Sequence, residues 1–152
     1  MARFVYRMQS VLNIKQQTEN QTKMEFAVAQ AELNKQLDIL EEYITRRDNY
    51  LKEAEELRNE DSLKLQDILD NQYATARMDV MIKQQAQIVR QYEDRVEKVR
   101  VKLTRNIQER KMQETLRDRA FSEYLEEQKQ EEAKENDQRT SFTYGQRQKE
   151  ED

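Results

Sequence analysis

The sequence has no cysteine, proline, histidine or tryptophan, and it has a single glycine. Proline and glycine are the residues that most often end helices and form tight turns, so their scarcity predicts long helices. Without cysteine or histidine the chain offers no thiolate nucleophile, no imidazole base and no common zinc ligand set. Carboxylate pairs such as Glu41-Glu42 lie on exposed helix faces, which lack the burial that acid–base catalysis requires. We therefore predict a protein that is not an enzyme and uses no cofactor and no metal.

Long hydrophobic runs are also missing. The longest, Phe26 to Ala29, has four residues, far short of the roughly 20 that span a bilayer. Residues 1–8 contain basic side chains but no continuous apolar core, so they do not predict a secretory signal. The net charge of −4 argues against binding to nucleic acid, which depends on neutralising phosphates. These features predict a soluble cytoplasmic protein.

Apolar residues are present at steps of three and four, the spacing of one helix face, in two stretches. This periodicity argues against a disordered chain, although 38% of the residues are charged. The stretches mirror each other about position 66, so that the numbers of facing residues add up to about 132 or 133. The members are Phe26, Ala29, Leu33, Leu37, Leu40, Ile44, Leu51 and Ala54 in the first stretch, and Met78, Ile82, Ala86, Val89, Tyr92, Val96, Val99, Leu103 and Ile107 in the second.

A constant sum is the register of one antiparallel seam, which predicts an all-α fold: a long antiparallel two-helix coiled coil, or helical hairpin. An antiparallel dimer of one long helix would satisfy the same seam and stays an alternative, but a short connector favours a monomeric hairpin. We expect a first long helix over 1–58, a turn and a short capping helix at the closed end over 59–74, and a second long helix over 75–132. Residues 133–152 are expected to form a disordered tail.

The seam becomes polar near the open end of the hairpin, where the chain termini lie. The expected register places Lys15 opposite Arg117, which is tolerable only where Glu19, Glu114 or a partner supplies negative charge. Two readings remain open for this end: a frayed, water-filled end, or a surface kept available for another protein.

Three stretches then suggest a family. Residues 4–15, FVYRMQSVLNIK, resemble the opening of the FliJ family, the soluble coiled-coil component of the bacterial flagellar type III export apparatus. Residues 107–111, followed by Ala120-Phe121, resemble the second helix of that family, and residues 143–145 resemble the tail of its Gram-positive members.

The resemblance implies a non-enzymatic component of flagellar protein export, and so a role in flagellum biogenesis, motility and chemotaxis. Such a protein would bind the hexameric export ATPase through the open end of the hairpin and promote its assembly and activity. It would also bind the cytoplasmic part of the export gate and escort unloaded export chaperones. Its expected location is cytoplasmic, peripherally at the inner face of the cell membrane at the flagellar base, where only its partners would hold it to the membrane.

Site residues follow from the same resemblance. Basic residues near the open end become candidates for contact with the ATPase: Arg7, Lys15, Arg110, Lys111, Arg117 and Arg119. Residues 36–43 resemble the first-helix part of the family's gate-binding patch, where Gln36, Leu40 and Tyr43 are the candidates. On the second helix Arg77-Met78 stands where the family often has an aromatic and an aliphatic residue, and Met81 is the candidate there.

Two other functions remain as alternatives. The chain could be an unrelated cytoplasmic coiled coil that spaces or dimerises partners. Alternatively, the amphipathic start from Arg3 to Leu12 could bind a membrane surface.

Overall fold

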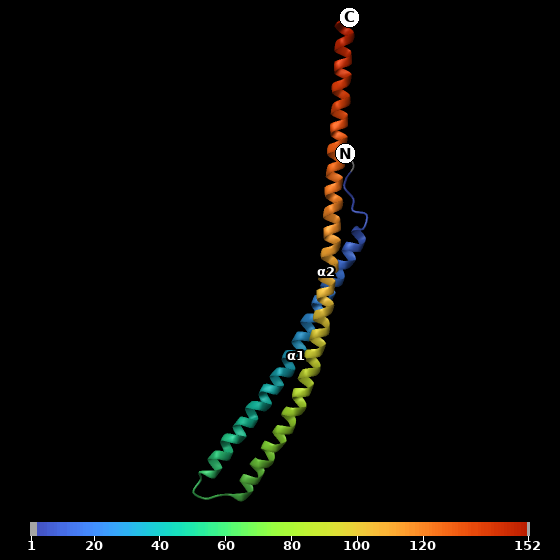
Figure 1. Cartoon of the computed structure of the whole chain (residues 1–152). Coiled ribbons are helices and arrows are strands. Elements are labelled where there is room, and N and C mark those ends of the chain that lie inside the picture. Colours follow the sequence, from blue (N-terminus) through green and yellow to red (C-terminus); the bar gives the residue numbers. More distant parts are fainter. Residues whose placement is uncertain (1–2, 152) are drawn as a thin grey trace. The chain divides into compact units, whose positions relative to one another are not determined.

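Residues 3–151 are described by the structure, a computed structural model, and they contain two helices, α1 (Gln9–Arg58) and α2 (Leu65–Glu151) (Figure 1). No residue in that range is part of a β-strand. The helices pack against each other antiparallel, so the predicted all-α helical hairpin is confirmed. No helix within the described range has an apolar stretch long enough to cross a membrane.

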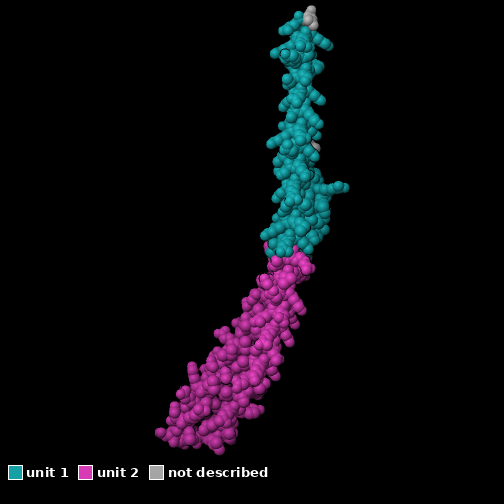
Figure 2. Space-filling model, in the orientation of Figure 1, with its two compact units in different colours: residues 1–19, 106–152 teal, residues 20–105 magenta. Residues whose placement is uncertain are grey.

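The chain divides into two compact units, each with a segment of both helices (Figure 2). Unit 1 comprises residues 1–19 and 106–152, of which 3–19 and 106–151 are described, and unit 2 comprises residues 20–105. Unit 2 contains the turn between the helices, and unit 1 contains both ends of the chain.

Along α1, a series of buried or half-buried residues recurs at alternating steps of three and four, the pattern of a coiled-coil seam. Leu37, Ile44 and Leu51, which were expected in this seam, lie at its edge and are 39–46% exposed. The apolar face of α1 is wider than the two positions in seven that a coiled-coil seam needs. At these places α2 packs on the preceding residues, which are Gln36, Tyr43 and Tyr50. The observed series is Leu12, Lys15, Glu19, Thr22, Phe26, Ala29, Leu33, Gln36, Leu40, Tyr43, Arg47, Tyr50, Ala54 and Leu57.

Several polar residues are consequently inside the seam. On α2, Asn71, Gln85 and Asn106 are buried, and Gln85 and Asn106 take places where Ala86 and Ile107 were expected. In unit 2 the side-chain amide of Asn71 donates a 2.8 Å hydrogen bond to the Tyr50 carbonyl oxygen. The amides of Asn71 and Gln85 are each paired with a group on α1, which avoids the cost of an unsatisfied polar group.

The register of the two helices also differs from the expected one. The contacting pairs of unit 2 have residue numbers that add up to between 121 and 127 rather than 132 or 133: Gln36–Gln85, Tyr50–Asn71, Arg47–Asp79 and Glu25–Lys102. The displacement is roughly one heptad, and a heptad repeat looks the same after a slip of seven residues. Apolar periodicity therefore could not choose between these registers, and the mirror point at 66 was wrong. The helices instead fold back at residues 59–64.

The helix boundaries agree with the prediction at one end and differ elsewhere. Arg58 ends α1 as expected, because the polar residues 59–62 that follow form the turn. α1 begins at Gln9 rather than near the chain start, and Met1 and Ala2 lie outside the described residues. Within the described range there is no separate capping helix, because nothing between Leu65 and the expected start at residue 75 interrupts helical hydrogen bonding, and α2 is continuous from Leu65.

α2 also continues to Glu151, where the sequence predicted a disordered tail from residue 133. This segment is rich in glutamate, glutamine and lysine, which favour helix. Thr140 and Thr143 bond to carbonyl oxygens one turn back, and Gly145 has no positive φ angle. Every described residue from 133 onward is exposed, so local propensity rather than packing sustains this helix.

Candidate functional site

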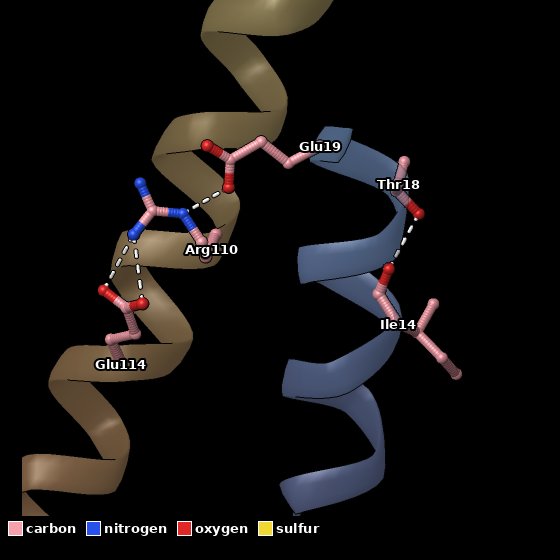
Figure 3. Close-up of polar contacts among 5 residues, drawn as sticks. All are labelled: Ile14, Thr18, Glu19, Arg110 and Glu114. Atoms are coloured by element: carbon pink, nitrogen blue, oxygen red, sulfur yellow. Dashed lines mark hydrogen bonds and ion pairs between the residues drawn. The ribbon is translucent and has the colours of Figure 1, made fainter. Parts of the chain in front are cut away.

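Unit 1 is built around an ion network inside its seam. Glu19 on α1 has a side chain only 5% exposed, and it accepts a hydrogen bond from the Arg110 Nε on α2 (Figure 3). The Arg110 Nη1 also donates to both carboxylate oxygens of Glu114, at 3.0 and 2.9 Å. Glu114 lies one turn beyond Arg110 on the same helix, so the spacing alone brings these two together. The hydrogen bonds that Arg110 donates to Glu114 and then to Glu19 raise the pKa of Arg110 above its ordinary value.

Lys15 pairs with Glu109 across the seam at 2.9 Å. The prediction that Lys15 lies opposite Arg117 is therefore wrong, because it was made from the expected register, which differs from the observed one by about one heptad. Glu19 and Glu114 do neutralise a basic residue in the seam, as the sequence required, but that residue is Arg110. The Thr18 hydroxyl donates to the Ile14 carbonyl oxygen at 2.9 Å within α1 (Figure 3). Much of the polarity of this end is thus satisfied internally, which argues against a frayed end.

The segment before α1 is held against α2 by aromatic residues. The Phe4 ring lies 5.1 Å from that of Phe121 and 5.4 Å from that of Tyr124, centroid to centroid. The Tyr6 hydroxyl donates to the Gln113 side-chain oxygen at 3.1 Å. The sequence analysis did not place Phe4 or Tyr6 against α2. The missed signal was two aromatic residues just ahead of the first helical turn.

All six predicted ATPase-contact residues belong to unit 1, but they divide into two groups. Lys15 and Arg110 are held in the internal ion pairs described above. The other four are exposed, and no ion pair or hydrogen bond to their charged groups is found within residues 3–151: Arg7, Lys111, Arg117 and Arg119. We call these four the basic group of unit 1. Their charge is available to an acidic partner, whereas that of Lys15 and Arg110 stabilises the hairpin.

The four predicted gate-contact residues belong to unit 2 and are half-buried. The Gln85 side-chain amide donates to both the backbone and the side-chain oxygen of Gln36, at 2.9 and 2.8 Å, so Gln36 holds the two helices together. Leu40 and Tyr43 occupy the seam and expose only part of their surface. Met81 lines a cavity of about 390 Å³ with Tyr73, which is 74% exposed and which sequence reasoning had not singled out as a contact residue.

Comparison with protein families decides the assignment. Residues 4–149 match the model of the family described as Flagellar FliJ protein, which is nearly the whole chain. The chain belongs to the FliJ family. Comparisons with curated proteins and with solved structures gave no match.

FliJ proteins are flagellar export proteins, so this chain is a component of flagellar protein export. The resemblance noted in the sequence is thereby confirmed. The family match spans both units, including the basic group of unit 1 and the four gate candidates of unit 2.

Proposed function

We propose that this FliJ-family chain is a non-enzymatic export component that binds the hexameric flagellar export ATPase through unit 1 and promotes its assembly and activity. The observation that carries this proposal is the division of the basic residues in unit 1. Lys15 and Arg110 are neutralised internally, while the four members of the basic group are exposed without an acidic partner in the described chain. Exposed charges of one sign accelerate and orient association with a surface of opposite sign.

The first test is the hydrolysis rate of the same organism's flagellar export ATPase, titrated with this protein. We expect stimulation by the wild type and a loss of most of it with Arg117→Glu, Arg119→Glu, because charge reversal turns attraction into repulsion. The effect should weaken as salt is raised, since contacts between exposed charges are screened over about 10 Å at 0.1 M salt.

A matched control is Arg90→Glu, Arg105→Glu, which makes the same change in net charge at exposed positions of unit 2. This control should stimulate as the wild type does. Equal stimulation by the wild type and the Arg117, Arg119 variant at low salt would show that the basic group is not the contact. No stimulation by the wild type would favour the alternative of a structural coiled coil, for which a stable dimer in solution would be the sign.

The same chain is proposed to bind the cytoplasmic part of the export gate through unit 2. We expect Tyr43 and Met81 to contact the gate, because each leaves part of an apolar side chain at the surface. The Gln36 side chain, in contrast, is hydrogen-bonded to Gln85 between the helices. Tyr43→Ala should weaken gate binding about tenfold, the loss typical of a tyrosine anchor at an interface. Isothermal titration calorimetry with the purified gate domain measures this change.

Tyr144→Ala provides the control for that measurement, because Tyr144 is 66% exposed and belongs to unit 1. Gate affinity should be unchanged in this variant. An unchanged affinity in Tyr43→Ala would remove Tyr43 from the interface. The escort of unloaded export chaperones, and a position at the inner face of the membrane through these partners, complete the proposed function and are supported by family membership alone.

A further inference from the structure

The segment that precedes α1 in unit 1 lies along α2 without being helical. Residues 3–7 alternate between exposed and half-buried, which is the period of an extended chain. The half-buried members, Phe4 and Tyr6, contact α2, and Val5 between them is 77% exposed. We call residues 3–7 the latch.

The latch is fastened to α2 at two points on one face of that helix. The Tyr6 hydroxyl donates to Gln113, and the Phe4 ring packs on Phe121, which lies about 12 Å further along α2. Arg117 lies midway between these points, four residues from each, and a spacing of four keeps residues on the same side of a helix. The latch therefore passes along the face of α2 that carries Arg117.

Closure of the latch gathers positive charge on this face. Arg7 directly follows Tyr6, and it is exposed, as are Arg3 and Arg117. For these three cations no ion pair is found within residues 3–151. Asp118 is next to Arg117 in the sequence, but consecutive residues of a helix do not face each other. The cations of the closed latch therefore repel one another, and salt screens this repulsion.

The contacts that oppose this repulsion lie near the surface. Phe4 and Tyr6 are only half-buried, and Phe121 stays 44% exposed although Phe4 packs on it. Segments held by contacts that water reaches open more readily than elements in a core. We therefore expect the latch to open at a free energy well below that of global unfolding.

We propose that closure of the latch positions Arg7 beside Arg117 as one contact for an acidic partner surface, and that binding of this surface holds the latch closed. The inference rests on the proposed function, which takes the acidic surface to be that of the export ATPase. Phe4 is then a positioning residue, which touches α2 and not the partner. It sets the affinity nonetheless, because a partner that binds only the closed form binds more weakly as the closed fraction falls.

The latch is tested on the full chain with a nitroxide label at Val5→Cys, since the chain has no other cysteine. In the closed latch this label should broaden the NMR amide signals of residues 113–121. Phe4→Ala should abolish most of the broadening, and Phe4→Tyr, which keeps the ring, should retain it. Phe142→Ala is the matched control, because Phe142 is 68% exposed in unit 1, and it should leave the broadening unchanged.

The response of the latch to negative charge is tested on the same labelled chain with a synthetic decaglutamate peptide at low salt. The peptide should strengthen the broadening in the wild type, because it offsets the repulsion between the cations. In Arg7→Ala it should have little effect. Raising the salt concentration without the peptide should also strengthen the broadening in the wild type, since screening weakens the same repulsion.

The coupling between Phe4 and Arg7 is tested by titrating the export ATPase with the two alanine variants and with their combination. Each single substitution should raise the concentration for half-maximal stimulation about fivefold, the upper range for an exposed ion pair. The double variant should be no weaker than Phe4→Ala, because an Arg7 that is no longer positioned contributes nothing. Arg117→Ala should still weaken Phe4→Ala further, because Arg117 is held by the helix itself.

Three results would each overturn the inference. They are unchanged broadening in Phe4→Ala, no response of the wild type to decaglutamate, and losses of Phe4→Ala and Arg7→Ala that add up in the double variant. Failure of the proposed function looks different. If decaglutamate closes the latch but the wild type does not stimulate the ATPase, the latch is retained as a contact for an acidic surface and the ATPase is rejected as its partner.

Discussion

Substitution of Gln36, Gln85 and Asn71 by leucine is expected to let the hairpin occupy two registers instead of one. These three residues supply the polar seam contacts Gln85–Gln36 and Asn71–Tyr50 of unit 2. A slip of about one heptad leaves an apolar seam apolar, but it separates each buried amide from its partner. Buried polar groups in coiled coils select register in this way at a cost in stability. The triple variant should therefore be at least as stable as the wild type but less specific.

Disulfide formation can measure the register directly, because the chain contains no cysteine. A cysteine pair at Arg47 and Asp79 reports the observed register, in which these two side chains form a 2.6 Å ion pair. A pair at Arg47 and Ala86 reports the register displaced by seven residues. In the wild-type background only the first pair should oxidise. In the triple-leucine background both pairs should oxidise.

The control places three leucines at exposed polar positions of unit 2, with Asn34→Leu, Gln84→Leu, Gln87→Leu. This background gains the same apolar side chains but keeps the buried amides, so only the Arg47, Asp79 pair should oxidise. Oxidation of that pair alone in both leucine backgrounds would mean that the turn over residues 59–64 or the ion pairs of unit 1, rather than the buried amides, select the register.

Truncation of Leu12 should lower the stability of unit 1 more than a change at an exposed position would. Leu12 is 1% exposed, close to the first turn of α1, and it is the only buried aliphatic side chain among the described residues of unit 1. Leu12→Ala should cost about 2–5 kcal/mol, the usual range for a buried leucine replaced by alanine. Hydrogen exchange of the backbone amides in α1 up to Glu19 measures this loss for unit 1 alone.

Ile14→Ala is the matched control, because Ile14 lies on the same turn of α1 and is 59% exposed. Its effect should stay within about 0.5 kcal/mol, as is usual for surface positions. Equal exchange in the Leu12 and Ile14 variants would show that the ion network of Glu19 and Arg110, and not apolar packing, holds this end together. In that case a Glu19→Gln variant should exchange rapidly throughout the same segment.

Much of the fold could be predicted from residue types and spacing. The scarcity of proline and glycine, and apolar residues at steps of three and four, predicted two long helices in a hairpin. The polar residues 59–62 placed the end of α1 at Arg58 correctly. The requirement for acidic groups near the basic seam residues identified Glu19 and Glu114, which the structure pairs with Arg110.

The candidate surfaces were predictable only in part. The sequence grouped the basic residues of the open end, but it could not separate Lys15 and Arg110 from the exposed basic group of unit 1, because that separation depends on which acidic residue lies opposite each one. Gln36 was predicted as a contact residue from family resemblance, yet its side chain bonds to Gln85. The cavity lined by Ala29 and Val99 was not foreseen, since it requires two residues far apart in the sequence to lie near each other.

The sequence by itself determined the two long helices and their antiparallel pairing, because helix propensity and apolar periodicity are local properties that one chain displays without a partner. Only the tertiary structure decided the register and the line of residues inside the seam. A heptad pattern is unchanged by a slip of seven residues, and an apolar face wider than the seam can be covered along either of two neighbouring lines. That choice depends on polar pairs such as Gln36 with Gln85, which form only when residues far apart in the sequence meet.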